Sequence, residues 1–259
     1  MTQGDAPVLF ARDGAVAILT LNRPVQRNAV NKELAEHLRI AVAELEADSG
    51  LRAAVLIAAG QAFCAGMDLE AFLNGDGDAI LFGQNRFAGF VDAERSKPII
   101  TAIEGPAFAG GLEIALACDM IVASTAARFA VPEVKVGLFP VAGGAFRLAR
   151  KIPASKAPEL CLTGEAIDAA EAYRLGLVNR LVAEGEALAE AMSLAKTIAA
   201  NAPLGVASAY QIGKMQAQFA ERDLWELSER LWQAVRESAD AQEGPAAFKA
   251  RRIPQWQGK

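Results

Sequence analysis

The residues with the clearest chemical potential are two glutamates in glycine- and proline-containing segments. Glu113 comes three residues after Gly110 and directly follows Gly111-Leu112, while Glu133 follows Pro132 in an otherwise apolar stretch. Because three residues span about one helical turn, a helix that begins at Gly110 would bring its first N–H groups and the Glu113 carboxylate to a common space. Such N–H groups can stabilise a developing oxyanion, and a carboxylate beside them can move a proton. A carboxyl group in apolar surroundings can also stay protonated near neutral pH, which suits Glu133 to acid catalysis.

A second candidate loop covers residues 61–69. It follows the continuously apolar run Ala53–Ala59, which is typical of a strand buried on both faces of a sheet. Loops at strand ends in α/β proteins are where ligands usually bind. The backbone N–H just after Gly66, which belongs to Met67, is therefore a second candidate donor to an oxyanion.

The same residues also fit purely structural roles. Glycines at a helix start permit tight packing against a strand, and a glutamate in the first helical turn interacts favourably with the helix dipole. An isolated glutamate at the end of a strand, such as Glu133, is commonly a surface residue. Spacing alone leaves both explanations open.

Several kinds of catalysis are excluded by residue type. The chain has one histidine, His37, so triads that use histidine and sites with several histidine ligands would all have to run through it. The spacing from Gly105 to Gly110 imitates a phosphate-binding loop, but Gly111-Leu112 stands where Lys-Ser/Thr must follow. We therefore expect no metal site, and we expect acid–base chemistry to use carboxylates, lysine, tyrosine or cysteine.

Composition limits the partners and the location. The 259 residues are 53% apolar and 22% charged, with a formal net charge of −5 and no cluster of Lys and Arg, which argues against a nucleic-acid partner. The longest apolar run has about seven residues, too few to cross a bilayer, and the first residues lack the features of a signal peptide. Three cysteines (Cys64, Cys118 and Cys161) without CxxC spacing favour a reducing compartment. We expect a cytoplasmic protein that does not associate with membranes.

Alternating patterns predict an α/β core. An Asp13-Gly14 turn joins two strand-like runs, and the apolar positions of a following segment recur every three or four residues, as in a helix with one buried face. The predicted strands are Val8–Phe10, Ala15–Leu21, Ala53–Ala59, Ile99–Ile103 and Met120–Ala123, and the predicted helices are Lys32–Asp48, Ala79–Glu94 and Gly110–Cys118.

From Pro153 onward the sequence is typical of helices almost throughout. The predicted helices cover 154–162, 168–175, 184–200, 203–219, 222–238 and 240–250. The break at Asn201-Ala202-Pro203 divides the chain into a predicted core, 1–200, and a C-terminal helical region, 201–259. Apolar residues of that region exceed what it can bury on itself, which favours an oligomerisation role or packing on the core; they are Leu224, Trp225, Leu227, Leu231, Trp232 and Val235.

Taken together, the motifs resemble those of the crotonase (enoyl-CoA hydratase/isomerase) family in order and spacing over nearly the whole chain. The matching segments are Leu21-Asn22-Arg23-Pro24, Asn28-Ala29, 62–69, 97–103, 105–113, Cys118-Asp119, Phe129 to Gly144, and 162–178. The resemblance implies a spiral of ββα units with a C-terminal helical region, and assembly as a homotrimer or a dimer of trimers. It also implies an acyl-CoA substrate and no redox or metal cofactor.

Carried over by motif, the resemblance assigns roles to particular residues. The backbone N–H groups of Met67 and Gly110 would hold the thioester oxygen, while Glu113 and Glu133 would hold one water molecule. The expected substrate-binding residues are Ala29, Ala65, Asp68, Leu69, Pro132 and Val141. The presence of both glutamates favours hydration of a trans-2-enoyl-CoA to a 3-hydroxyacyl-CoA, with Glu113 accepting a proton from water and Glu133 donating one to Cα.

Two departures from the family pattern concern the water site. Val141 stands where many hydratases have glycine, and Ala145-Phe146 stands where Thr-Gln is usual. The alternatives are therefore a specialised hydratase, such as one acting on a carnitine-type enoyl-CoA, a Δ3,Δ2-enoyl-CoA isomerase that needs a single carboxylate, and a non-catalytic acyl-CoA-binding protein.

Overall fold

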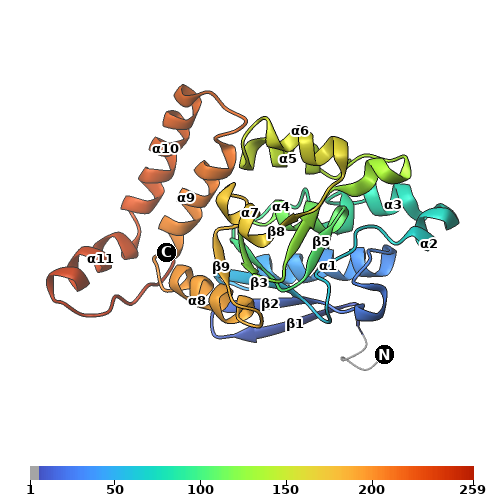
Figure 1. The fold of residues 1–259 in the computed structure, drawn as a ribbon. Helices are drawn as coiled ribbons and strands as arrows, with labels where there is room; N and C mark the ends of the chain where they lie inside the picture. Colours follow the sequence, from blue (N-terminus) through green and yellow to red (C-terminus); the bar gives the residue numbers. More distant parts are fainter. Residues whose placement is uncertain (1–5) are drawn as a thin grey trace.

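Two β-sheets form the centre of the protein (Figure 1). The structure is a computed structural model that describes residues 6–259. In the larger sheet the strands follow the order β1 (Val8–Asp13), β2 (Val16–Leu21), β3 (Ala53–Ala58), β4 (Ile99–Ile103), β6 (Met120–Ser124) and β9 (Arg180–Val182). The hairpin β1–β2 is antiparallel, as predicted, and the other neighbours are parallel. The smaller sheet contains β5 (Pro106–Phe108), β7 (Arg128–Ala130) and β8 (Ile167–Asp168).

Helices follow the strand pairs in the spiral of ββα units that the sequence predicts. Around the core lie α1 (Lys32–Ala47), α2 (Leu69–Ala71), α3 (Gly77–Phe82), α4 (Gly110–Ala117), α5 (Gly144–Lys151), α6 (Lys156–Thr163), α7 (Ala169–Arg174) and α8 (Ala187–Ala199). Short 3-10 helices are η1 (Pro24–Gln26), η3 (Phe87–Gly89) and η4 (Pro132–Val136), and a π-helical turn, η2, covers Phe72–Asp76. The chain ends in α9 (Pro203–Met215), α10 (Glu221–Arg236) and α11 (Ala239–Lys249).

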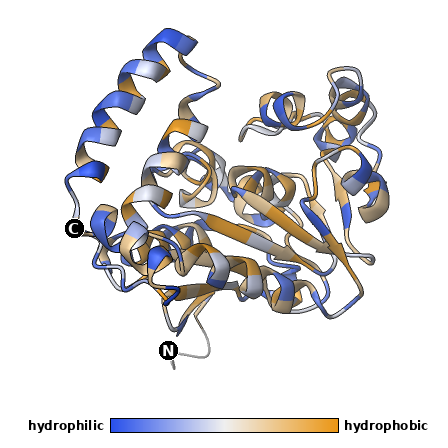
Figure 2. Ribbon diagram, turned by 90° about the vertical axis from the view of Figure 1, so that its left-hand side faces the viewer, coloured by the Kyte–Doolittle hydropathy of each residue, from blue (hydrophilic) through white to orange (hydrophobic). Residues whose placement is uncertain are grey.

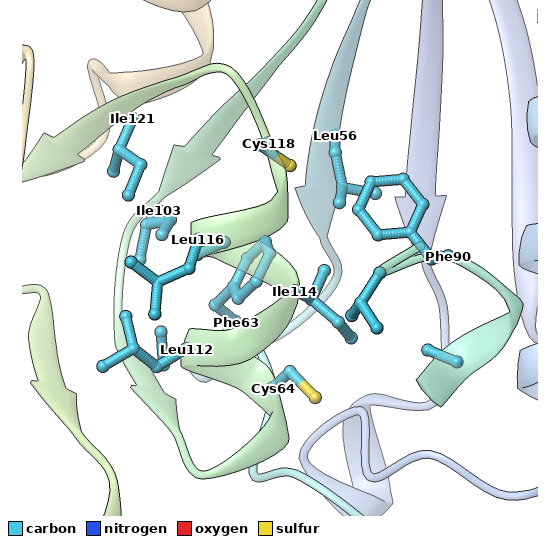
Figure 3. Packing of buried hydrophobic residues seen from close by; sticks show 14 of the residues in the cluster. Leu56, Phe63, Cys64, Phe90, Ile103, Leu112, Ile114, Leu116, Cys118 and Ile121 are labelled. Carbon is cyan, nitrogen blue, oxygen red and sulfur yellow. The ribbon is translucent and has the colours of Figure 1, made fainter. Parts of the chain in front are cut away.

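Helix α4, which carries Glu113, lies in the middle of the hydrophobic core. Leu112, Ile114 and Leu116 are all at most 3% exposed. Figure 3 shows Leu112 and Leu116 on the side of the helix toward Ile103 and Ile121, and Ile114 on the side toward Phe90. A helix that is apolar all round is stable only when it is buried on all sides. The position of Glu113 is therefore fixed by core packing.

The opposite face of the larger sheet is covered by α8. Its buried residues are alanines at every fourth position, Ala187, Ala191, Ala195 and Ala199, and they pack on apolar side chains of the strands. Because alanine is small, the helix can approach the sheet closely. Figure 2 shows the strands largely hydrophobic (orange), with hydrophilic (blue) residues on the outer helices.

The C-terminal helices lie to one side of the core (Figure 1). Neither α9 nor α10 has a buried residue, and Trp225 and Trp232 are each 63% exposed. The last residues return along this region, where the buried Asp240 accepts hydrogen bonds from the N–H groups of Gln257 and Gly258. The division into domains at residue 201 stays a prediction.

One sequence prediction about the fold was wrong. The helix expected at Ala79–Glu94 ends at Phe82, because Asn85, Arg86 and Ala88 adopt positive φ angles and the segment packs irregularly against α1. The region after Pro153 is helical almost throughout, as predicted, and contains in addition the strands β8 and β9, which have only two and three residues. Such short strands show no measurable periodicity.

The other predicted elements agree with the structure within a few residues. Helix α1 begins where Asn31 accepts a hydrogen bond from the Leu34 N–H at 2.9 Å, an N-cap that matches its predicted start. His37 is half-buried on this helix, beside the buried stripe that contains Leu38. Over residues 6–259, the helices are all too short or too polar to cross a membrane.

Candidate functional site

The first candidate oxyanion donor, the N–H of Met67, lies in a loop that pairs with the segment before α1. Val30 donates to the Gly66 carbonyl at 2.8 Å and accepts from the Asp68 N–H at 2.9 Å, which makes a parallel bridge between Val30 and Met67. In this arrangement the N–H and C=O of Val30 make both hydrogen bonds of the bridge, and the N–H and C=O of Met67 point away from Val30. The Met67 N–H is thus left unpaired by its neighbouring segment.

The second candidate donor, the N–H of Gly110, begins α4. Ala109 before it adopts φ 51°, a conformation in which non-glycine residues are uncommon, and this turns the chain sharply from β5 into the helix. The first N–H groups of a helix have no acceptor inside the helix. Among the described residues no backbone acceptor is found for the N–H of Gly110 or of Met67.

The two donor segments touch through their backbones. A Cβ atom built on Gly66 would lie 3.0 Å from the Gly110 nitrogen and 2.8 Å from the Ala109 Cβ. A second contact is the bridge between Cys64 and Ala107, in which the Phe108 N–H donates to the Cys64 carbonyl at 3.0 Å. The loop and the helix start, about 40 residues apart in sequence, therefore form one unit.

Asn28 holds the outer side of this loop, a role that the sequence reasoning missed. Its side chain is fully buried, donates to the carbonyls of Ala59 and Ala62 at 2.9 Å each, and accepts from the Arg23 N–H at 2.8 Å. Asn28 has φ 56°, and asparagine is one of the few side chains that tolerate this region. The Asn28-Ala29 motif was recognised in the sequence, but nothing in its spacing indicated what the amide binds.

Glu113 is buried beside the start of α5. Its side chain is 3% exposed, and its Oε1 accepts a hydrogen bond from the Gly144 N–H at 2.8 Å. Burial is the main cause that raises the pKa of Glu113 to about 7; the nearby Glu133 also raises it, while the Gly144 and Ala142 N–H groups and the Arg147 charge lower it. Glu113 is therefore much easier to protonate than an ordinary glutamate.

Glu133 sits in η4 and is half-buried. Among the described residues its Oε2 is buried and has no hydrogen-bond partner, and burial raises the pKa of this carboxyl as well. A buried polar atom without a partner costs about 1–3 kcal/mol unless water or a ligand satisfies it. The orphan oxygen thus indicates that a polar molecule belongs beside Glu133.

The two glutamates form an electrostatically coupled pair. Glu133 contributes to the raised pKa of Glu113, and both glutamates raise the pKa of Cys161 on α6. Interacting carboxyls titrate as a pair, with the first proton leaving more easily than the second. Their electrostatic influence means that Glu113 and Glu133 lie near one another; that the two carboxyls hold one water molecule stays a prediction.

Three of the expected substrate-binding residues, Ala29, Ala65 and Asp68, lie on or beside the loop of residues 61–69. The N–H of Ala65 donates to the Arg27 carbonyl at 3.0 Å, and Ala29 accepts a hydrogen bond from the Arg23 guanidinium. Asp68 caps α2 through the N–H groups of Glu70 and Ala71 and also pairs with Arg23 at 3.1 Å, so its carboxylate already has protein partners. The remaining members are the exposed Leu69, Pro132 at the start of η4, and the half-buried Val141 before α5.

The arrangement can bind a thioester and move protons beside it. Two backbone N–H groups on touching segments can hold one carbonyl oxygen, and two coupled carboxyls can hold a water molecule or exchange protons with carbon. Within residues 6–259 no group of three or more His, Cys, Asp or Glu side chains is arranged to hold a metal ion.

Comparisons with known proteins identify the family. The family model described as enoyl-CoA hydratase/isomerase matches residues 11–259. The chain is 38% identical over 256 residues to the enoyl-CoA hydratase EchA19 of Mycobacterium tuberculosis, covering 97% of this chain and 96% of that protein. It is 37% identical over 252 residues to the carnitinyl-CoA dehydratase of Proteus mirabilis, covering 95% and 96%.

Solved structures give the same result. A crystal structure of an enoyl-CoA hydratase from Mycobacterium tuberculosis superposes with a TM-score of 0.94 at 41% identity, covering 98% of this chain and all of that one. The fold, the motifs and the relatives agree over nearly the full length. The chain belongs to the enoyl-CoA hydratase/isomerase family, which acts on acyl-CoA substrates without a further cofactor.

Proposed function

We propose that the protein is an enoyl-CoA hydratase that adds water across the 2,3 double bond of a trans-2-enoyl-CoA. The observation that carries this proposal is the coupled carboxyl pair, buried Glu113 and half-buried Glu133, with an unpartnered oxygen on Glu133. The same chain supplies the N–H groups of Met67 and Gly110, for which no backbone acceptor is found among the described residues. Hydration needs one group to accept a proton from water and another to protonate carbon, and the chain supplies both.

In the proposed mechanism the N–H groups of Met67 and Gly110 hold the thioester oxygen. Their hydrogen bonds polarise the conjugated system, so that Cβ becomes electrophilic and negative charge develops on the oxygen as an enolate. A single donor of this kind contributes about 3–4 kcal/mol in other enzymes. Water held by the pair attacks Cβ as its proton passes to Glu113, and Glu133 delivers a proton to Cα.

The mechanism needs one proton on the pair before the reaction. In the absence of substrate the burial of Glu113 favours that proton on Glu113, whereas the reacting arrangement has it on Glu133. We infer that the pair shares one proton and that the form with Glu113 ionised reacts, since a coupled pair populates both forms.

The test is hydration of crotonyl-CoA and of longer enoyl-CoA thioesters, followed by the loss of conjugated-thioester absorbance. Glu113→Gln and Glu133→Gln should each lower kcat by at least about 10²-fold, because each removes a positioned acid or base. Glu165→Gln is the matched control, since Glu165 is exposed and pairs with Lys135 of η4. Full activity of both catalytic-pair variants would refute the assignment.

A second candidate is dehydration and hydration of carnitinyl-CoA. It is supported by relatives named carnitinyl-CoA dehydratase at 36–38% identity and by the two departures from the family pattern at Val141 and Phe146. A substrate panel that includes carnitinyl-CoA separates the two. An isomerase, which needs one carboxylate, would convert a 3-enoyl-CoA faster than it hydrates the 2-enoyl isomer, and a non-catalytic binder would bind CoA esters without turnover.

We also propose that the protein assembles as a homotrimer or a dimer of trimers through residues 201–259. The support is the family resemblance together with the exposed Trp225 and Trp232 on α10, which has no buried residue. A mass of about 27.3 kDa in light scattering, one chain, would contradict it. A reducing, cytoplasmic location is supported by the three free cysteines.

A further inference from the structure

Arg147 contacts the turn that binds Glu113. The turn, residues 140–144, precedes α5, and a Cβ built on its Gly144 would lie 3.1 Å from the Glu113 Cγ. A Cβ built on the preceding Gly143 would lie 2.4 Å from the Arg147 Nη1. A side chain at either position would therefore have to displace one of these groups, since the Glu113 side chain and the Arg147 guanidinium lie directly against the backbone of the turn.

The Arg147 guanidinium joins this turn to a second segment. Its Nη1 donates to the Ala142 carbonyl at 3.0 Å, and its Nη2 donates to the Val91 carbonyl at 2.5 Å. The planar fork of arginine can make both bonds at once, which a lysine cannot do with the same geometry. Arg147 thereby fixes the orientation of the peptide that leads to the Gly144 N–H, the donor to Glu113.

The charge of Arg147 also acts on Glu113. Half-buried, the guanidinium is bonded to carbonyl oxygens, and its positive charge lowers the pKa of Glu113 against the effect of burial. The other groups that face Glu113 are the Gly144 and Ala142 N–H groups on the same turn, Glu133 on η4, and the neutral thiol of Cys161 on α6. Among these groups Arg147 is the one full positive charge.

We propose that Arg147 is a positioning residue for the catalytic pair: its guanidinium, bonded to the Ala142 and Val91 carbonyls, fixes the turn whose Gly144 N–H binds Glu113 and brings a positive charge close to that carboxylate. This inference rests on the proposed function, in which Glu113 accepts a proton from water.

The first measurement is independent of turnover. Infrared difference titration, with Glu113→Gln as the subtraction reference, follows the carboxyl carbonyl band of protonated Glu113 in the substrate-free enzyme. In Arg147→Met the titration should move to higher pH by about one unit, as expected on losing a nearby opposite charge. In Arg147→Lys, which keeps the charge, it should stay near the wild-type position.

The second measurement is the pH profile of kcat/KM with an enoyl-CoA. The acid limb of the Arg147→Met profile should move in the same direction. Relative to the wild type, kcat/KM of the variant should then be about tenfold lower at pH values below the wild-type midpoint than at high pH. Arg147→Lys should lower kcat at all pH values, because the fork is lost, without moving the limb. Arg150→Met is the matched control on the same helix: Arg150 stacks on Phe146, as Arg147 does, but it is exposed, and the hydrogen bonds to the Ala142 and Val91 carbonyls come from Arg147.

The results separate the two levels of inference. An unchanged Glu113 titration in Arg147→Met overturns the role of its charge, whatever the activity. A shifted titration in a protein that hydrates no enoyl-CoA supports the electrostatic role and refutes the proposed function instead. Should Arg147→Met fail to fold, Arg147→Gln against Arg147→Lys makes the same comparison between a neutral and a charged side chain.

Discussion

Replacing Gly66 with alanine tests whether the contact between the two donor segments is needed for catalysis. The new Cβ would lie 2.8 Å from the Ala109 Cβ and 3.0 Å from the Gly110 nitrogen, whereas carbon atoms pack best at about 3.5–4.0 Å. The loop and the start of α4 must therefore separate by about 0.5–1 Å. A donor that contacts an oxyanion at about 2.9 Å loses most of its hydrogen bond over such a displacement.

The expected loss is the contribution of about one oxyanion donor. This corresponds to about 3–4 kcal/mol in the transition state, or a fall in kcat of about 10²–10³-fold. Gly66 also has φ +98°, so alanine adds backbone strain of about 1–2 kcal/mol that lowers the free energy of unfolding. The two effects must be measured separately.

Gly185→Ala separates them. Gly185 has φ +87° and no atom within 4 Å of an added Cβ, so its alanine variant carries similar strain without the steric contact. Both variants should show a melting temperature lower by a few degrees, and only Gly66→Ala should lose kcat in the enoyl-CoA assay. If Gly66→Ala keeps a kcat within threefold of Gly185→Ala, the Met67 and Gly110 N–H groups do not act as the oxyanion hole.

Three further predictions concern buried polar groups. Burial raises the pKa of Glu113 from 4.5 to about 7. The contribution of protonated Glu113 to the free energy of unfolding is therefore complete below pH 4.5 and is lost as the pH rises through 7. Glu113→Gln should be more stable than the wild type at pH 8, by up to about 3 kcal/mol, and by less at pH 5. Equal pH dependence of the two melting curves would contradict this. Asn28→Ala removes three buried hydrogen bonds and should cost about 2–3 kcal/mol in chemical denaturation and also lower kcat, whereas a loss of stability with unchanged kcat would show that Asn28 does not position the loop. Asp240→Ala removes the acceptor of two N–H groups, those of Gln257 and Gly258, near the end of the chain. Carboxypeptidase should therefore digest these last residues faster, while kcat stays unchanged. Equal digestion rates would show that Asp240 does not hold the last residues in place.

The elements predicted best from the sequence are those whose burial is periodic or complete. The stripe of Leu34, Leu38 and Leu45 gave the bounds of α1 to within one residue, and the apolar runs gave β3 and β4. The helix prediction was wrong for residues 84–94 because the apolar residues of this segment, Phe87 and Phe90 among them, are buried without forming a regular helix. Periodicity reports which residues are buried, and positive φ angles at non-glycine residues leave no such pattern.

The candidate site could be predicted only in part from the residues. The spacing from Gly110 to Glu113 placed a donor and a carboxylate near one another within a single helix, a local relation. The loop after Ala59 was also identified as a candidate donor, but the contact of its Gly66 with Gly110 depends on packing across about 40 residues, which spacing does not encode. The roles of Asn28 and Arg147 depend on which carbonyls their side chains reach, and sequence spacing does not encode such partners.

The crossing of the two donor segments also limits how the enzyme can change. A Cβ on Gly105 would lie 1.9 Å from the Gln61 carbonyl oxygen, and one on Gly111 would lie 2.1 Å from the Cys64 carbonyl oxygen. Laboratory evolution toward new acyl groups should therefore leave these glycines untouched. The substitutions that such evolution accepts should occur at more exposed positions, such as Val141 and Phe146, where the side-chain volume can change without moving the main chain.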